Sequence, residues 1–105
     1  MNIKFEDWEK LDLKVGTILS VEDHPNADKL YVLKVDIGEE RQLVAGIKES
    51  YSKEELINKK IIVIANLEPV KLRGIESNGM LLAVGEKEIS LLTLDKDANN
   101  GDRVR

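Results

Sequence analysis

The stretch from residue 51 to residue 66 reads YSKEELINKKIIVIAN and joins a short helix signal to a strongly apolar strand signal. Ser52 and Glu55 form an S-x-x-E capping box, in which each side chain satisfies a free amide of the first helical turn. Tyr51 and Leu56 stand where the two residues of a hydrophobic staple belong. A short helix is therefore predicted to begin at Ser52, with a strand directly after it.

That strand, KIIVIAN, is apolar on both faces, as expected for a central or barrel-closing strand. Three other segments with strand character precede the helix and one follows, so that five strands are expected at residues 13–22, 29–37, 41–47, 60–66 and 79–85. Three strands, a short helix and two more strands are the order of an OB-fold. We predict an all-β fold, a five-stranded OB-fold barrel with one short helix between strands 3 and 4, formed by residues 1–105 as a single domain.

Two segments lie outside a plain five-stranded barrel. The N-terminal segment has apolar residues at helix-like intervals and predicts a short helix. The segment ISLLTL, residues 89–94, predicts an extra strand that is apolar on both faces and therefore needs two partners. A second copy of the chain would supply one of them, which predicts a homodimer; the alternative is that the N-terminal segment covers this strand. The expected dimer interface comprises Ile3, Phe5, Trp8, Ile89, Leu91, Leu92 and Leu94.

The composition narrows the class of protein. Hydrophobic residues make up 42% of the 105 residues and charged residues 34%, which is the balance of a soluble globular domain. No apolar run is long enough to span a membrane, and a cytoplasmic location is expected. The absence of cysteine excludes disulfides and cysteine-based zinc sites. No nucleophile–base pair, phosphate-cradling loop or metal cluster stands out, so no catalysis, cofactor or metal is expected.

The formal net charge of −4 argues against nucleic-acid binding unless cations gather locally. The loop NLEPVKLRGIESNGM, residues 66–80, carries Lys71 and Arg73. In an OB-fold this loop and the loop HPNADK, residues 24–29, flank the same binding face. Arg73 can fork two phosphate oxygens, whereas Lys71 acts as a point charge. The residues expected around this basic patch are His24, Asn26 and Lys29 from the second loop, and Tyr31, Arg41 and Gln42 from strands 2 and 3.

Tyr31 is the one aromatic ring placed to stack on a base, and this scarcity favours recognition of folded RNA by shape and backbone. His24 is interpreted as a turn residue rather than a metal ligand, because no second ligand is near it in sequence. A pair such as Lys71 and Arg73 is more often solvated surface than a binding site. The residues alone therefore indicate a ligand-binding barrel with an anionic ligand.

Two long stretches resemble a known family. Residues 12–39, DLKVGTILSVEDHPNADKLYVLKVDIGE, and residues 65–83, ANLEPVKLRGIESNGMLLA, are similar to the tRNA-binding OB domain. The specific part of the likeness is the pair HPNADKL and LRGxxSxGM in this order and spacing. The domain occurs free-standing, as the C-terminal or β-subunit module of methionyl-tRNA synthetases, and in phenylalanyl-tRNA synthetase β subunits and multisynthetase auxiliary proteins.

The resemblance implies tRNA binding that is structure-specific and sequence-tolerant, without catalysis. The chain would act as the β subunit or as a trans-acting affinity module of a synthetase, with a methionyl-tRNA synthetase catalytic chain as its first candidate partner. A homodimer is implied, and Ser77 and Met80 are expected in a small pocket beside the RNA. The tRNA-contacting residues implied by the family are Asn26, Lys29, Arg41, Lys71, Arg73, Ser77 and Met80.

The sequence departs from the family pattern at two positions. Glu68 stands where the family commonly has Lys, and Lys14 stands where it commonly has Arg. Glu68 removes positive charge from the basic loop and is expected to weaken binding. A secretion-associated chaperone of the same superfamily, which binds polypeptides as a similar dimer, is the alternative function; it lacks the HPNADKL pattern.

Overall fold

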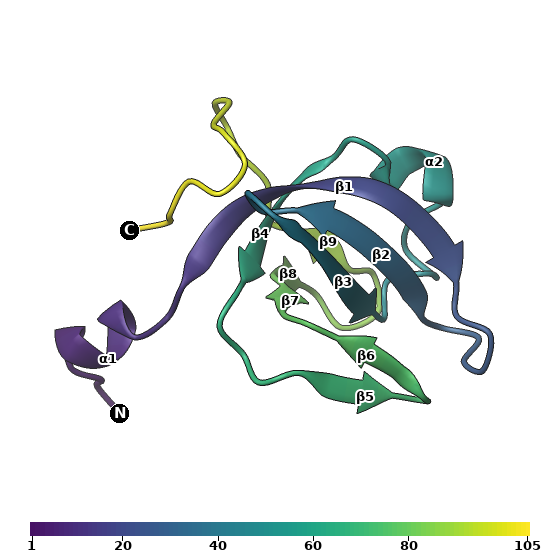
Figure 1. Cartoon of the computed structure of the whole chain (residues 1–105), viewed down its shortest axis with the longest axis horizontal. Coiled ribbons are helices and arrows are strands. Elements are labelled where there is room, and N and C mark those ends of the chain that lie inside the picture. Colours follow the sequence, from purple (N-terminus) through teal and green to yellow (C-terminus); the bar gives the residue numbers. More distant parts are fainter.

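The computed structural model describes all 105 residues, and one long strand, β1 (Leu13–Asp23), organises it. β1 pairs antiparallel with β2 (Tyr31–Asp36) on one side and with β4 (Lys60–Ile64) on the other. β3 (Glu40–Ala45) extends the sheet beyond β2, and β7 (Met80–Leu81) extends it beyond β4. The strand order is β3-β2-β1-β4-β7, and Figure 1 shows the sheet curling round to a nearly closed barrel. The predicted all-β, OB-like barrel is confirmed.

The curvature of β1 has two local causes. Its register with β2 shifts between Ile18 and Ser20, as at a β-bulge, which bends a strand and increases its twist. At Gly16 an added Cβ would lie 2.8 Å from the side chain of Ile37 and 3.2 Å from the carbonyl oxygen of Asp36. Glycine is needed there because the neighbouring chain crosses too close for any side chain.

The predicted helix is α2 (Lys53–Leu56), between β3 and β4. The Ser52 hydroxyl oxygen accepts a hydrogen bond of 3.4 Å from the Glu55 amide, as the capping box requires. Leu56 is fully buried and anchors the helix to the barrel. The predicted position of this helix, on which the OB-fold prediction rested, is confirmed.

The core forms because alternate residues of the strands point inward. A main cluster of fifteen buried residues fills the barrel, and a smaller cluster lies beneath the start of β1. The main cluster is Ile18, Val21, Tyr31, Leu33, Val35, Ile37, Leu43, Ala45, Ile47, Leu56, Ile61, Val63, Ala65, Leu81 and Leu91. The smaller cluster is Leu13, Val15 and Ile62, with Trp8 and Leu94 packed against it.

The second half of the chain differs from the prediction. The expected loop at residues 66–80 contains a hairpin of its own, β5 (Val70–Leu72) and β6 (Ile75–Ser77), which forms a separate two-stranded sheet. The expected fifth strand is divided into β7 and β8 (Ala83–Val84). The extra strand shrinks to β9 (Ser90–Leu91), which pairs with β8.

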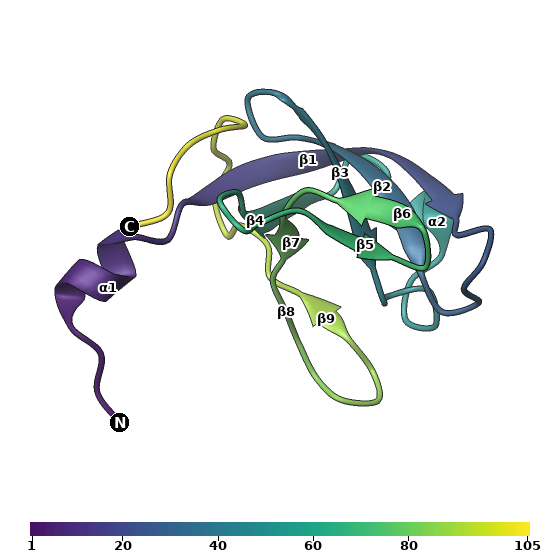
Figure 2. The same ribbon diagram turned by 60° about the horizontal axis from the view of Figure 1, so that its bottom comes forward.

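Both ends of the chain meet beside the start of β1. The short helix α1 (Phe5–Glu9) precedes β1 and projects away from the barrel in Figure 2. The C-terminal segment runs along β1, where the Val15 amide donates to the Asp102 carbonyl oxygen at 2.9 Å and the Val104 amide to that of Leu13 at 2.8 Å. The two helices span five and four residues, and neither has the length or apolar character to cross a membrane.

Candidate nucleic-acid interface

Hairpin β5–β6 presents the two cations that the sequence singled out. Lys71 pairs in register with Glu76, and Leu72 with Ile75, so Arg73 and Gly74 form a two-residue turn. Their φ angles are 52° and 89°, the conformation of a type I′ turn, whose twist matches that of the flanking strands. Because Leu72 lines a cavity against the barrel and strand residues alternate in direction, Lys71 faces outward.

The loop between β1 and β2 holds one strand of this hairpin. His24 is only 5% exposed, and its Nε2 lies 2.8 Å from the carbonyl oxygen of Leu72. Its Nδ1 accepts a hydrogen bond of 3.0 Å from the Asn26 amide, so Nε2 must carry the proton and donate to Leu72. The Asn26 side-chain amide reaches the carbonyl oxygen of Arg73 at 3.4 Å. The expected proximity of the two loops is thereby confirmed for Asn26.

Strand β3 holds the other strand of the hairpin. The Gln42 side-chain amide donates to the carbonyl oxygen of Glu76 at 2.8 Å, and the Asn78 amide donates to the carbonyl oxygen of Gln42 at 2.8 Å. Lys34 donates to the Gln42 side-chain oxygen at 2.9 Å. Lys34 therefore faces the hairpin.

Ser77 and Tyr31 are structural residues. Ser77 is 3% exposed; its hydroxyl oxygen accepts from the Val44 amide at 3.0 Å and its hydroxyl group donates to the Gly79 carbonyl oxygen at 3.1 Å. Tyr31 is 4% exposed, and its hydroxyl donates to the carbonyl oxygen of Tyr51 at 2.8 Å. The expectation that Tyr31 offers a stacking platform is wrong, because its ring lies in the core.

Arg41 is half-buried and mostly engaged by the protein itself. Its guanidinium donates to the carbonyl oxygens of Ala65 and Asn78, at 2.9 and 3.3 Å, and pairs with Glu39 at 3.0 Å. These bonds fix both ends of the segment that contains the hairpin. Arg41 thus contacts the two ends of this segment, at Ala65 and Asn78, and not the turn at Arg73.

Lys71 and Arg73 are exposed and take part in no ion pair, whereas seven ion pairs engage other cations of the chain. Lys29 is exposed and lies 3.6 Å from Glu49, a pair that solvent weakens. Glu68 and Glu76, also exposed, reduce the positive potential around the hairpin. Five exposed side chains that the sequence assigned to RNA binding, Asn26, Lys29, Lys71, Arg73 and Met80, are called the hairpin face below.

An apolar cavity of about 310 Å³ adjoins the hairpin face. Met80, which is 56% exposed, forms part of its rim. The cavity is lined by Leu30, Val44, Ala45, Gly46, Ile47, Leu72, Met80, Leu81, Ala83 and Ile89. Met80 is thus placed beside a pocket, as the resemblance implied, whereas Ser77 supports the backbone of Val44 in the pocket wall.

A carboxylate begins the β1–β2 loop. Asp23 lies 3.2 Å from the ammonium groups of both Lys53 and Lys48. The hydrogen bond from Lys53, followed by that from Lys48, lowers the pKa of Asp23 below its usual value. These pairs connect the base of the loop to α2 and its preceding turn.

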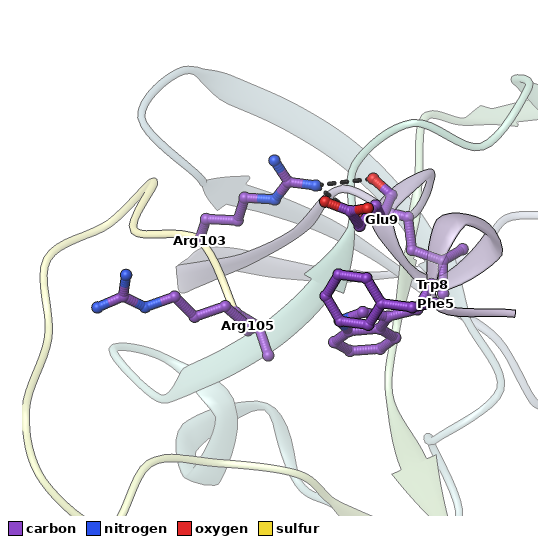
Figure 3. Close-up of a pocket in the computed structure, with 7 residues that line it drawn as sticks. Phe5, Trp8, Glu9, Arg103 and Arg105 are labelled. Atoms are coloured by element: carbon purple, nitrogen blue, oxygen red, sulfur yellow. Dashed lines mark hydrogen bonds between the residues drawn. The ribbon is translucent and has the colours of Figure 1, made fainter.

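A groove of about 210 Å³ lies at the other end of β1, where α1 meets the C-terminal segment. Figure 3 shows Phe5, Trp8 and Arg103 around it, with Arg103 donating to the carbonyl oxygen of Glu9 at 2.9 Å. Phe5 is 71% exposed, and Ile3 and Leu92 are exposed as well.

The other residues expected at a dimer interface are buried or half-buried within the chain. Leu91 belongs to the main core, which corrects its predicted place at the interface, and Ile89 packs against the same core. Trp8 and Leu94 pack on the smaller cluster, in keeping with the alternative that the N-terminal segment covers this region.

The sequence placed His24 beside Lys71 and Arg73, as observed, but interpreted it as a turn residue and missed its hydrogen bond to the hairpin. A single His before a Pro-Asn turn gives no indication that its partner is a carbonyl group 48 residues away. No group of three or more His, Asp or Glu side chains is arranged to hold a metal ion.

Known proteins similar to this chain include synthetases and chaperones. Methionine–tRNA ligase of Thermococcus onnurineus is 62% identical over 105 residues, which cover 98% of this chain but 14% of the ligase. The solved structure of a MetRS-related protein from Pyrococcus horikoshii is 34% identical with a TM-score of 0.92, covering 100% of this chain and 99% of that one. The CsaA chaperone structure from Picrophilus torridus is also 34% identical with a TM-score of 0.92, covering 99% and 100%.

This chain spans only a small part of the ligase that it resembles, and nearly all of the two smaller solved proteins. Residues 13–103 match the family described as putative tRNA binding domain, from the first residue of β1 to the C-terminal segment that pairs with it. The chain therefore belongs to the putative tRNA binding domain family.

Proposed function

We propose that this chain is a single binding module that holds folded tRNA on the hairpin face. The observation that carries the proposal is the position of Lys71 and Arg73, exposed and free of ion pairs on a hairpin fixed to the barrel from both sides. Arg73 at the turn offers a planar fork for two phosphate oxygens, and Lys71 offers a point charge two residues earlier. A rigid scaffold reduces the conformational entropy that these long side chains lose on binding.

The mode of recognition follows from what surrounds these cations. Neither tyrosine is exposed on the hairpin face. The one exposed aromatic side chain, Phe5, belongs to α1, which lies at the opposite end of β1 (Figure 1). Base stacking therefore contributes little there, which favours contacts with the sugar–phosphate backbone of a folded RNA. With Lys29, Lys71 and Arg73 each neutralising one phosphate, we expect a slope of log K against log salt of about −2 to −3.

Filter binding of tRNA over a range of salt concentrations tests the proposal. The double variant Lys71→Ala, Arg73→Ala should bind at least about tenfold more weakly, because it loses two charge-assisted contacts. Its salt slope should be shallower by about 2. The matched control is Lys4→Ala, Lys96→Ala, which removes the same charge from two exposed, unpaired positions elsewhere. An equal loss of tRNA affinity in both double variants would refute a specific binding face, because net charge alone would then explain the affinity.

A homodimer is proposed through the groove at the N- and C-terminal ends. Phe5 supports it because it lines that groove and leaves apolar surface exposed. Ile3, just before α1, and Leu92, just after β9, are exposed as well. Two hairpin faces on one two-fold body would increase avidity for a large RNA. Sedimentation should find a dimer for the wild type and a monomer for Phe5→Glu, while Leu19→Glu, on another exposed apolar position, should stay dimeric. A monomeric wild type would overturn this part.

The partner is proposed to be a methionyl-tRNA synthetase catalytic chain, which the module serves in the cytoplasm as a β subunit or in trans. The support is the 62% identity to a segment of methionine–tRNA ligase. Adding the module should lower the KM of the catalytic chain for tRNA without changing kcat, since it supplies uniform binding remote from the chemistry. An unchanged KM would contradict the partnership without touching tRNA binding itself.

Peptide binding is the second candidate, favoured by the apolar cavity and by the likeness to the CsaA structure. An apolar side chain in that cavity would bind with little dependence on salt. Salt-insensitive binding of an unfolded polypeptide that survives Lys71→Ala, Arg73→Ala would therefore favour this candidate over tRNA.

A further inference from the structure

We propose that His24 is a positioning residue for RNA binding, whose imidazole locks β5 in the one geometry that presents Lys71 and Arg73 together. The inference rests on the proposed tRNA binding and adds a residue that does not itself touch RNA. The hairpin is not part of the five-stranded sheet, so its place on the barrel is set by the packing of Leu72 and by a few hydrogen bonds, most of them from side chains.

The bonds from the β1–β2 loop converge on Arg73. The carbonyl oxygen of Leu72, held by His24, belongs to the peptide unit before Arg73. The carbonyl oxygen of Arg73, held by Asn26, belongs to the peptide unit after it. Both peptide planes that flank the Arg73 Cα atom are thereby restrained, which fixes the direction in which its side chain leaves the turn.

Arg73 also needs such support for a conformational reason. Its φ of 52° is in the left-handed region, which is unfavourable for residues other than glycine. Without the two bonds, the turn would be free to relax toward other conformations. His24 is suited to hold it because it is buried and both of its ring nitrogens are engaged in a single tautomer.

The contacts of β6 are separate from this lock. Gln42 holds the carbonyl oxygen of Glu76, and Ser77 is bonded to Val44, so β6 stays attached when His24 is changed. Loss of the imidazole should therefore loosen β5 and the turn while the rest of the barrel keeps its structure. The two cations would then have to be ordered on binding, which lowers affinity without changing how many phosphates they neutralise.

Two substitutions separate the two ring nitrogens. His24→Asn keeps an acceptor near the place of Nδ1 for the Asn26 amide but is too short to reach Leu72. His24→Gln keeps a donor near the place of Nε2 for Leu72 and loses the acceptor. The matched control is Thr17→Val, which removes a hydrogen bond of 2.7 Å to Asn100 away from the hairpin.

Two measurements decide the matter: tRNA affinity with its salt slope, and hydrogen–deuterium exchange of the hairpin amides without RNA. We expect His24→Asn to bind about five- to tenfold more weakly with an unchanged salt slope, and its β5–β6 amides to exchange faster. His24→Gln should retain most of the affinity, and Thr17→Val should bind as the wild type does.

Wild-type affinity in His24→Asn, or equal losses in His24→Asn and Thr17→Val, would overturn the inference. If the wild type itself does not bind tRNA, the proposed function fails. Hydrogen–deuterium exchange alone then tests whether His24 holds β5 in place. Unchanged exchange of the hairpin amides in His24→Asn would then overturn it, and faster exchange confined to them would uphold it.

Discussion

The main-chain amide of Val44 donates a hydrogen bond of 3.0 Å to the side-chain oxygen of Ser77, which joins β3 to β6 where both are buried. This contact lies under the hairpin face, and beside it the Asn78 amide donates a backbone hydrogen bond to the carbonyl oxygen of Gln42. It connects the wall of the apolar cavity to the strand that leads out of the basic hairpin.

The first prediction concerns Ser77. Ser77→Ala leaves the buried Val44 amide without its partner, so the free energy of unfolding should fall by about 1–3 kcal/mol. Denaturant unfolding measures the loss, and Ser90→Ala, at an exposed position of β9, is the control with little expected change. If Ser77→Ala instead weakened tRNA binding at unchanged stability and unchanged salt slope, Ser77 would be an uncharged RNA contact after all.

The second prediction concerns Tyr31. Tyr31→Phe removes only the hydroxyl that donates to the Tyr51 carbonyl oxygen, and should lower the free energy of unfolding by about 1 kcal/mol. Affinity for tRNA should stay within about twofold of the wild type, because the group removed is buried. Denaturant unfolding and filter binding of tRNA, carried out on the same preparation, measure the two quantities. A large loss of affinity without a loss of stability would mean that Tyr31 reaches the RNA.

The third prediction concerns Glu68, which precedes the hairpin and is exposed. Glu68→Lys should tighten tRNA binding and steepen the salt slope by about 1, because it adds one cation near the phosphates. Filter binding at several salt concentrations checks this. Glu6→Lys on α1 makes the same change of charge at the far end of β1 and should leave the slope as it is. A salt slope that steepens equally in Glu68→Lys and Glu6→Lys would mean that net charge, and not the hairpin face, determines tRNA binding.

The fourth prediction concerns pH. Lys53 and Lys48 lower the pKa of Asp23 in the folded chain, so the unfolded chain takes up this proton first as the pH falls. The contribution of Asp23 to stability is therefore complete above the unfolded pKa, about 4, and is lost as the pH falls through the folded value. Unfolding of Asp23→Asn and wild type between about pH 6 and pH 2 should show two curves that converge at the acid end. A gap that stays constant over this range would exclude the mechanism.

The barrel could be predicted because its signals are local. The capping box at Ser52 and Glu55 acts within one helical turn, and it appears in the structure at that place. Alternation along β2 also placed Tyr31 on the same face as Leu33 and Val35, which is the core face. The expectation of a stacking role for Tyr31 ignored that period of two.

The hairpin and its lock could not be read from the sequence because their causes are not local. A left-handed Arg73 is unusual, and the partners of His24 and Gln42 are provided by chain crossings 48 and 34 residues away. Arg41 shows the same limit, since its cationic group is occupied by carbonyl groups that the folded chain alone brings near. Residue type predicted which side chains could meet RNA, and only the fold determined which of them are free to do so.

The two-residue turn at Arg73 and Gly74 fixes the number of residues in the basic hairpin. Neighbouring residues along a strand face opposite ways. One residue inserted in β5 before Leu72 would therefore turn a cation toward the apolar cavity and expose the leucine to water. Spacing is thus as much a part of this recognition element as charge. A relative that keeps every cation but changes the count between Pro69 and Gly74 should be expected to lose the surface altogether.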